Sequence, residues 1–467
     1  MRISQLKRRL VGLLKEFKGE RIGMVGLGLI VFLFTIAFLA PVLAPETDGK
    51  WNDVDRWRDV PRGAAPVWMD YLSTESRAPH LVEEDFYMAG QGQYDILTFE
   101  YDYDYEVPPR RIVTYVEGRA ESESVEMILE FIRPDGESLQ LSSDKIRARG
   151  DEESGYTFQT RITLLRTQAQ RDRIFRFARS FEGDSDVSQS SMDSAETIFS
   201  KANETILSDP EPLHGSYRLE YKLLGDGVEV LDSKSIFMGR IYGAMGTDDD
   251  GHDIGLGWFW GARYGLLLGL AVGGLTVVIG LFFGMTSAYY GGWVDEFMQR
   301  INELVMGIPI FPIIVIISVV WGRSLYYVIF IMGLLYWRGV AKTIRARGLQ
   351  IRQETYVEAS QALGAGGGRI IRTHMIPQMV PYALAEGALM VPVAIIVAAG
   401  LNVLGLGDPS VVTWGRMLSE ANSAGAVIRG MWWWVLLPGI GITLVGFGFI
   451  SAGMSIERIV NPKMKQS

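Results

Sequence analysis

Long apolar stretches occur near the start of the chain and throughout its second half. A bilayer core of about 30 Å needs roughly 20 apolar residues in a helix, so nearly uncharged windows of that length predict transmembrane helices. Prolines and a glycine interrupt the third and fourth windows. The six windows are Ile22–Ala44, Tyr264–Tyr289, Ile301–Trp321, Leu325–Ala341, Met379–Leu401 and Trp432–Met454. This pattern predicts an α-helical polytopic membrane protein with six transmembrane helices.

The first window, residues 22–44, has two interpretations, a secretory signal peptide or a permanent anchor. It is 23 residues long, prolines stand at positions 41 and 45, and a small-residue cleavage site is absent. A signal peptide has a shorter apolar region followed by such a site. We therefore assign residues 22–44 as transmembrane helix 1.

Between the first two windows the pattern changes to that of a folded polar domain. Polar and apolar residues alternate strictly over Ser216–Leu223, and a Gly-Asp-Gly turn leads from there to Val228–Val230, which predicts a β-hairpin. Val125–Ile132 leads through "RPDGE" into "SLQL" in the same way, and Thr163–Phe181 has the pattern of an amphipathic helix. We predict a β-rich α+β insertion domain over residues 46–257.

Acidic residues are concentrated in that domain. Residues 46–257 contain 43 Asp and Glu and 23 Lys and Arg, a net charge of −20, whereas the whole chain carries −9. If the N-terminus is cytoplasmic, the inside segments 1–21, 290–300, 338–378 and 455–467 contain 18 of the other 22 basic residues. This distribution follows the positive-inside rule. It places both termini in the cytoplasm and residues 46–257 outside, as an extracytoplasmic domain.

Sequence motifs for catalysis are missing. The chain has no cysteine, its four histidines are scattered, and it contains no GxSxG, HExxH or GxxxxGK[ST] motif. Thr247–Asp253, "TDDDGHD", suggests a calcium loop, but the spacing lacks the first ligand and the bidentate glutamate. We predict no catalytic residues, no cofactor, no metal site and no nucleic-acid binding.

Two features lie inside the predicted spans. Glycines recur every four residues along the second window and would let another helix approach one face closely. These glycines are Gly261, Gly265, Gly269 and Gly273. Glu386, in the fifth window, is a carboxylate at membrane depth that must face protein or water. A structural arginine partner and a place on a substrate path are equally good interpretations of Glu386.

The polar stretch Tyr356–Pro381 interrupts the apolar second half of the chain. A helical run, Tyr356–Leu363, stops at Gly364, and three more glycines follow before Arg369–Met375, a second short helix predicted to end at Pro377. Glycines permit a sharp reversal of the chain. An exposed helix–turn–helix of this kind is suited to docking in a groove of a partner protein.

The same stretch resembles a known motif. Glu358, Ala359, Gly364 and Pro377 match the EAA loop of permease subunits in binding-protein-dependent ABC importers: E-A-A, three residues, a glycine, and a proline after an apolar pair. Three other segments resemble the C-type permease of dipeptide and oligopeptide importers: Gly246–Arg263, Leu404–Leu418 and Trp432–Gly439. The resemblance covers the first span and the chain from about residue 246 onward.

The chain also departs from the family pattern. Ser360 replaces the second alanine of the motif, and three glycines replace a stretch that is usually polar. His252 stands where the family usually has arginine, and Ala398 where an acidic residue is common. The large domain over residues 46–257 is not part of the usual subunit.

The resemblance implies a type I ABC importer permease fold, like that of the methionine importer, with a permease core over residues 261–454 and a cytoplasmic coupling loop over 354–378. It implies these partners: a second, B-type permease, two ABC ATPase subunits that hydrolyse the ATP, an extracytoplasmic solute-binding protein, a peptide substrate and membrane lipid. The predicted ATPase-coupling residues are Glu358, Ala359, Ser360, Leu363, Gly364, Ile376 and Pro377.

Two alternatives remain at this point. A permease of the same fold could import a metal chelate, an opine or a sugar. The chain could also be a sensor or enzyme that acts through its outer domain, with the spans as an anchor. For the outer domain we expect a role in docking the binding protein, because it is tied at both ends to the first two spans and its charge of −20 can steer a basic partner.

Overall fold

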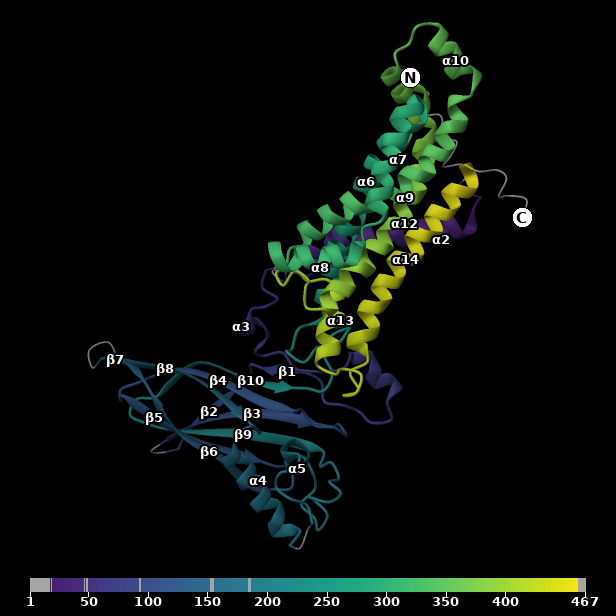
Figure 1. Cartoon of the computed structure of the whole chain (residues 1–467). Helices are drawn as coiled ribbons and strands as arrows, with labels where there is room; N and C mark the ends of the chain where they lie inside the picture. Colours follow the sequence, from purple (N-terminus) through teal and green to yellow (C-terminus); the bar gives the residue numbers. More distant parts are fainter. Residues whose placement is uncertain are drawn as a thin grey trace. The chain divides into compact units, whose positions relative to one another are not determined.

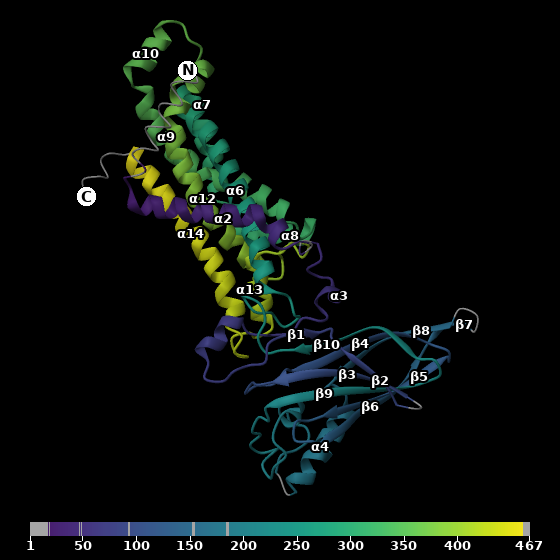
Figure 2. The ribbon, with the colours of Figure 1, turned by 180° about the vertical axis from the view of Figure 1, so that it is seen from behind.

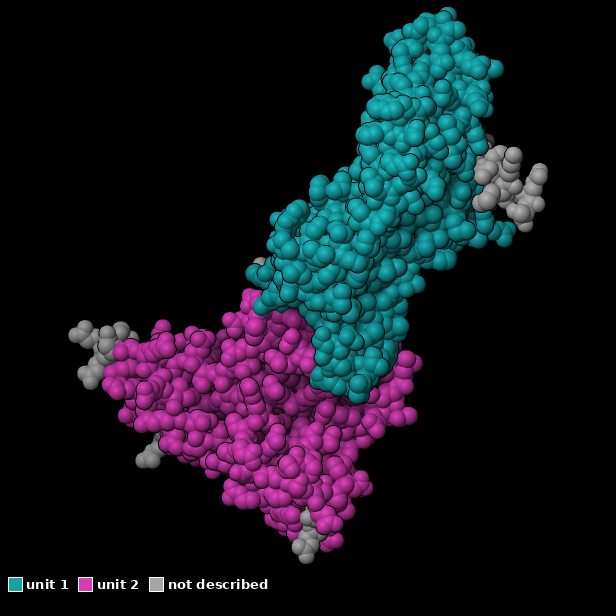
Figure 3. Space-filling model, in the orientation of Figure 1, with its two compact units in different colours: residues 1–52, 255–467 teal, residues 53–254 magenta. Residues whose placement is uncertain are grey.

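A computed structural model describes residue 17 and residues 19–45, 47, 49–91, 94–151, 155–183 and 186–460. The predicted cytoplasmic tails therefore lie largely outside the described residues. The chain divides into two compact units, shown in different colours in Figure 3: residues 1–52 with 255–467, and residues 53–254. The second unit falls within the predicted insertion, residues 46–257. Each unit is described separately below.

The first unit is helical (Figure 1). Its helices are α2 (Arg21–Leu43), α6 (Ile254–Tyr290), α7 (Gly292–Met306), α8 (Ile310–Trp321), α9 (Leu325–Arg352), α10 (Thr355–Ala362), α11 (Gly367–Ile370), α12 (Ile376–Val403), α13 (Trp414–Ser423) and α14 (Trp433–Val460), with a π-helical turn, η2 (Ile371–Met375), before α12. Helix α14 packs chiefly against α12 and α2, and Figure 2 shows α2 crossing it.

Five helical segments are long and apolar enough to cross a membrane: Arg21–Leu43, Ile254–Tyr290, Leu325–Arg352, Gly367–Val403 and Trp433–Ile459. The prediction of a polytopic helical membrane protein is confirmed. The third window is wrong as one straight helix, because α7 and α8 meet at an angle of 70°. Helix α7 ends before Gly307 and α8 starts after Pro309, which has no backbone N–H to continue the ladder of the preceding helix.

The second unit is rich in β-strands. Its strands are β1 (Leu81–Glu83), β2 (Tyr87–Gln91), β3 (Tyr94–Tyr103), β4 (Arg111–Ala120), β5 (Ser124–Ile132), β6 (Ser138–Arg147), β7 (Arg149–Asp151), β8 (Gly155–Leu164), β9 (Gly215–Leu224) and β10 (Glu229–Met238). They form two five-stranded sheets with the orders β1-β10-β4-β8-β7 and β2-β3-β9-β5-β6. Its short helices are α3 (Val54–Trp57), the 3-10 helix η1 (Val67–Leu72), α4 (Gln168–Phe181) and α5 (Ser194–Ile198). The predicted β-rich region is confirmed.

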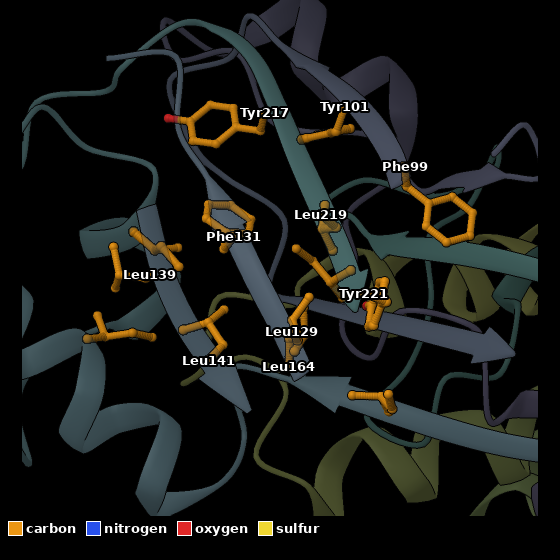
Figure 4. Close-up of a cluster of buried hydrophobic side chains, with 14 of the residues drawn as sticks. Phe99, Tyr101, Leu129, Phe131, Leu139, Leu141, Leu164, Tyr217, Leu219 and Tyr221 are labelled. Atoms are coloured by element: carbon orange, nitrogen blue, oxygen red, sulfur yellow. The ribbon is translucent and has the colours of Figure 1, made fainter. Parts of the chain in front are cut away.

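The core of this unit lies between the two sheets, because alternate residues of the strands point inward from each. Figure 4 shows part of it, with Phe131, Leu219 and Tyr221 from the second sheet and Leu164 from the first. The buried Tyr221 hydroxyl donates to Thr114 Oγ1 at 2.6 Å, which joins the two sheets through a polar contact inside the apolar layer.

One of the two predicted hairpins is confirmed. Strands β5 and β6 pair in antiparallel fashion from Ser124↔Arg147 to Ile132↔Ser138. The hairpin of β9 with β10 is wrong: β9 pairs with β3 and β5, and β10 pairs with β4 and β1. The turn at Gly225–Gly227 instead carries the chain from one sheet to the other. Gly227 has φ +60°, which glycine adopts at little cost.

The amphipathic segment predicted over Thr163–Phe181 divides into two elements. Its first two residues end β8, and the helix α4 begins at Gln168. A capping box fixes this start, because the Thr167 hydroxyl accepts from Gln170 N–H while the Gln170 side chain accepts from Thr167 N–H. Helix α4 packs against β6, and Arg173 donates to the Gln140 carbonyl at 2.9 Å.

Candidate functional site

The polar interruption between the apolar helices folds as a capped helix and a tight turn. Helix α10 ends at Ala362, and Gly364 follows with φ +79°. The N–H of Gly364 donates to Gln361 O at 2.9 Å, and the N–H of Ala365 donates to Ser360 O at 3.0 Å. These two bonds form a Schellman motif, which satisfies the last carbonyls of the helix. Because Gly364 is left-handed, the chain reverses immediately after α10.

The inner face of α10 and its turn packs against other helices of the same chain. Val357 of α10 is fully buried and belongs to an apolar cluster with Ile370 and Met375, and with Met285 of α6 and Ile344 of α9. This packing holds α10 at the end of the helical unit, beyond the ends of α9 and α12 (Figures 1 and 2). A displacement of α10 would therefore be transmitted to α6 and α9.

The outer face of α10 is open. Glu358 and Ala359 are exposed, and the Leu363 side chain is 88% exposed. Glu358, Ala359 and Leu363 are therefore accessible to another protein. Ser360 turns its hydroxyl back to Tyr356 O at 2.7 Å, while Ile376 and Pro377 are partly buried beneath the turn.

The structure corrects the predicted second helix. It does not end at Pro377: α11, η2 and α12 form one helical segment from Gly367 to Val403. Pro377 sits in the first turn of α12, after the π-helical turn, where its missing N–H costs little. The turn after α10 thus leads directly into the helical segment Gly367–Val403, which is long and apolar enough to span a membrane.

The four glycines around this turn, at positions 364, 366, 367 and 368, have different roles. Of the four, only Gly364 has a positive φ. Gly367 is needed for close approach, because a Cβ there would lie 2.6 Å from Tyr289 Cε1 of α6. The turn is also held by Gln361, whose amide donates to the Tyr289 hydroxyl at 3.4 Å. Tyr289 lies 72 residues before Gln361, so nothing in the local sequence pattern marks it as the partner of Gln361.

Glycines along α6 lie against other helices. A Cβ on Gly261 would be 2.4 Å from the Trp414 ring, and one on Gly269 would be 2.5 Å from Val391 Cγ1. A Cβ on Gly273 would be 2.8 Å from Gly387 O, whereas Gly265 has ordinary contacts. The row thus faces α13 at its start and α12 farther along.

The row continues beyond the residues singled out from the sequence. A Cβ on Gly280 would lie 2.8 Å from Val340, and one on Gly284 would lie 2.7 Å from Ala341 O, both on α9. Gly280 follows Gly273 by seven residues, two helical turns, so a longer search at helical spacing finds it. Helix α6 therefore contacts α12 and α9 in succession, each through glycine.

Comparisons with known proteins show which family the chain belongs to. Residues 277–466 match the family model of the binding-protein-dependent transport system inner membrane component, and residues 11–59 match that of the N-terminal TM domain of oligopeptide transport permease C. The chain is 33% identical over 223 residues to the oligopeptide transport system permease protein OppC of Bacillus subtilis (strain 168), covering 48% of this chain and 72% of that protein. The chain belongs to this permease family.

Other relatives carry similar names. The dipeptide transport system permease protein DppC of Bacillus subtilis (strain 168) is 31% identical over 48% of this chain and 69% of its own length. OppC of Haemophilus influenzae (strain ATCC 51907 / DSM 11121 / KW20 / Rd) is 28% identical over 48% of this chain and 71% of its own length. Permeases of this family are transport subunits and not enzymes. Neither family model covers residues 60–276.

In this permease the segment Leu404–Leu418 forms a tightly bonded cap on the helices. Trp414 is buried, donates to Trp258 O at 3.1 Å and fills the space left by Gly261 and Gly441. Asp408 accepts from Leu325 N–H at 3.0 Å, which fixes the start of α9. The cap thus joins α6, α9, α13 and α14.

The segment just before the β-rich unit also contacts this cap. Trp51 is 2% exposed, and a Cβ on Gly257 would lie 2.6 Å from its ring. Asn52 accepts from Arg416 Nη2 at 2.6 Å and donates to Pro409 O at 3.0 Å. Trp51 and Asn52 therefore belong to the helical unit, although they lie within the predicted insertion, residues 46–257.

The aspartate-rich loop of the permease, Thr247–Asp253, is closed by its own side chains. Asp248 is 2% exposed and accepts from His252 N–H at 2.8 Å, and His252 Nδ1 lies 2.6 Å from Asp248 Oδ2. Thr247 donates to Pro61 O at 2.6 Å and accepts from Ala64 N–H at 2.8 Å. Among the described residues no group of three His, Cys, Asp or Glu could hold a metal ion.

Glu386 of α12 is partly buried between helices of the permease. Its carboxyl group lies near Thr343 and Arg347 of α9 and near Glu457 of α14. Arg347 also stacks on the Tyr382 ring, with 3.9 Å from its guanidinium carbon to the ring centroid. Glu386 thus has polar neighbours on α9 and a like charge nearby on α14.

Proposed function

We propose that this chain is the C-type permease subunit of a peptide ABC importer. In the proposed complex it forms the translocation path with a second, B-type permease, receives peptides from an extracytoplasmic binding protein and is driven by two ATPase subunits. The support is the match to the inner membrane component family and to permeases named for oligopeptide and dipeptide transport. Those names favour a peptide over a metal chelate, an opine or a sugar, and a complete permease core argues against a simple anchor.

The proposed topology has six spans in a type I importer fold, with the bent pair α7 and α8 counted as one. The match to an inner membrane component and the bacterial relatives support a prokaryotic inner-membrane protein. The charge distribution supports both termini in the cytoplasm and residues 46–257 outside. In this orientation α10 lies in the cytoplasm, on the side of the ATPases.

The helix α10 and the turn at Gly364 are the observation that carries the proposal. Their inner face is packed on α6 and α9, their outer face presents Glu358, Ala359 and Leu363, and their second arm is continuous with α12. A partner that moves α10 therefore moves spanning helices directly. We propose that an ATPase cleft holds this outer face and that closure on ATP changes the access of the path.

Gly364 provides the test. A non-glycine residue in the left-handed region costs roughly 1–2 kcal/mol, and a β-branched residue is still less suited to it. Gly364→Val should therefore open the Schellman turn and lower both peptide uptake and binding-protein-stimulated ATP hydrolysis, while the protein still folds and inserts.

The matched control is Gly366→Val. Gly366 has φ −67° and ψ 148°, which valine adopts readily, and a Cβ there would meet nothing within 4 Å. This variant should keep most of its uptake and ATP hydrolysis in reconstituted vesicles. Wild-type coupling in Gly364→Val, or equal losses in both variants, would show that the turn does not couple the subunits.

We also propose that the β-rich unit assists delivery by the binding protein, because its charge can steer a basic partner at low salt. Contacts at its two ends support a deletion that tests this role. Arg240 N–H donates to Ala78 O at 2.8 Å, and a Cβ on Gly239 would lie 2.2 Å from the Pro79 carbonyl carbon. The segments that enter and leave the β-sandwich therefore lie side by side, so a short linker can replace the sandwich.

A further inference from the structure

The β-rich unit contains a polar cavity with a volume of about 300 Å³. It lies where three segments meet: the residue before β4, the first turns of α4 with the residue after β8, and residues 191–195 leading into α5. Arg110 comes from the first segment, Arg171 from the second, and Ser191 and Ser194 from the third. The cavity is thus lined by two guanidinium groups and two hydroxyl groups brought together by the fold.

Ser194 has an unusual position in this cavity. It is 7% exposed, and its hydroxyl has no hydrogen-bond partner among the described residues. Buried hydroxyl groups are nearly always bonded, because leaving one unpaired costs about 1–3 kcal/mol. An unsatisfied donor that lines a cavity is therefore suited to a ligand that accepts a hydrogen bond.

The charged residues that line the cavity are Arg110, Arg171 and Asp193, a net charge of +1, although the unit as a whole is strongly acidic. Burial lowers the pKa of Arg111, the first residue of β4, and the nearby charges of Arg166, Arg62 and Arg161 lower it further. Arg161 is paired with Asp59 at 3.3 Å, whereas Arg171 has no acidic partner among the described residues. Arg171 is therefore available to pair with an anion in the cavity.

One acid also lines the cavity, and the protein already uses it. Asp193 Oδ1 accepts from the N–H groups of Ala195 and Glu196 at 2.9 and 3.4 Å, and Oδ2 lies 3.4 Å from Arg240 Nη2. Asp193 therefore has partners of its own, although it shares Arg240 with Glu196, whose carboxylate lies 3.9 Å from the same guanidinium group. Arg110 is exposed and donates to Arg62 O at 2.8 Å, which fixes one side of its guanidinium group.

The backbone beside the cavity is strained. Leu165 lines it with φ +65°, a conformation that non-glycine residues rarely adopt. Such strain persists only where the surrounding structure enforces it, and it is concentrated at functional sites. Here it turns the chain from β8 toward α4, the helix that carries Arg171.

We propose that this cavity binds a small carboxylate or phosphate anion, with Arg110 and Arg171 pairing with its oxygens and Ser194 donating a hydrogen bond. A water molecule occupies about 30 Å³ of liquid, so about 300 Å³ accommodates an oxyanion or the carboxylate end of a small molecule with its water. Planar guanidinium groups match the geometry of both oxyanions.

The test is calorimetric titration of the full-length permease in nanodiscs of zwitterionic lipid, with inorganic phosphate or acetate replacing chloride at constant ionic strength. Wild type should bind one anion saturably. Arg171→Gln should weaken binding roughly tenfold or more, because it removes a charged hydrogen bond. Arg176→Gln is the control: Arg176 is exposed on the same helix, lies outside the cavity wall and carries the same charge.

Ser194→Ala separates binding from a purely structural role. Without phosphate it should raise the melting temperature, because an unsatisfied buried hydroxyl is removed, and it should weaken phosphate binding roughly fivefold. A second titration in nanodiscs with anionic lipid distinguishes the source of the anion: competition there assigns the site to a lipid headgroup, and unchanged binding assigns it to a soluble anion. Absence of saturable binding in both lipids, or equal losses in Arg171→Gln and Arg176→Gln, would overturn the proposal.

Discussion

The contact of α6 with α12 can be tested by adding one methyl group. In Gly269→Ala the new Cβ would lie 2.5 Å from Val391 Cγ1 and 3.1 Å from Val391 O. Carbon atoms pack best at about 3.5–4.0 Å, so the two helices would have to separate by about 1 Å. Valine is stiff at χ1 and cannot turn its methyl groups aside freely.

The control is Gly274→Ala on the same helix. Gly274 lines an apolar groove of about 700 Å³ between α2, α6, α12 and α14, and a Cβ there would meet nothing within 4 Å. Both substitutions gain the same helix propensity, up to about 1 kcal/mol. Overpacking costs about 1–3 kcal/mol, so the difference between the two variants isolates the packing term.

The assay is thermal unfolding of the purified permease in detergent, followed by circular dichroism of its helices. Gly269→Ala should be less stable than Gly274→Ala by about 1–3 kcal/mol, and Gly274→Ala should match or exceed wild type. Equal stability of the two variants would refute close packing of α6 on α12 at Gly269.

Three further predictions concern the role of the β-rich unit, the membrane topology and an ion pair in the β-rich unit. Replacing Leu81–Met238, which contains all ten described strands, by a short flexible linker should preserve assembly with the partner permease and ATPases but raise the binding-protein concentration needed for half-maximal ATP hydrolysis; an unchanged requirement at low salt would contradict the docking role. Protease added outside intact cells should cut within residues 53–254 and leave the loop 338–378 intact, and external cleavage in that loop would reverse the proposed orientation. The hydrogen bond from Lys222 lowers the pKa of Glu130 below 4.5, so this pair stabilises the β-rich unit above that pH and the stabilisation is lost on acidification. In thermal melts of the full-length protein, Glu130→Gln should lower the melting temperature of this unit at neutral pH but not well below pH 4.5. An equal effect at the two pH values would contradict the role of the pair.

Features with local causes were predictable from the sequence. The spans follow from runs of about 20 apolar residues, and the helix α10 with its reversal at Gly364 follows from a helical run that meets a glycine. The β5–β6 hairpin is also local, because its turn joins strands that pair with each other.

Features that depend on distant segments were not predictable. The alternation in β9 marks a half-buried strand but does not say whether its partner is β10 or β3. Pro377 is a helix-stop signal locally, yet it fits the first turn of α12. The cavity near Ser194 combines Arg110 and Arg171 from separate segments, and the strongly acidic composition of the domain conceals their proximity.

The most direct test of the proposed function is to label the outer face of α10 with a thiol reagent. The chain has no cysteine, so Leu363→Cys introduces a unique thiol at a position that is 88% exposed. Ile428→Cys, at a position that is 93% exposed in the loop after α13, serves as the control. Maleimide should label both variants in the permease alone. Adding the ATPase subunits should protect only Leu363→Cys, whereas equal labelling of this variant with and without the ATPases would contradict the coupling role of the turn.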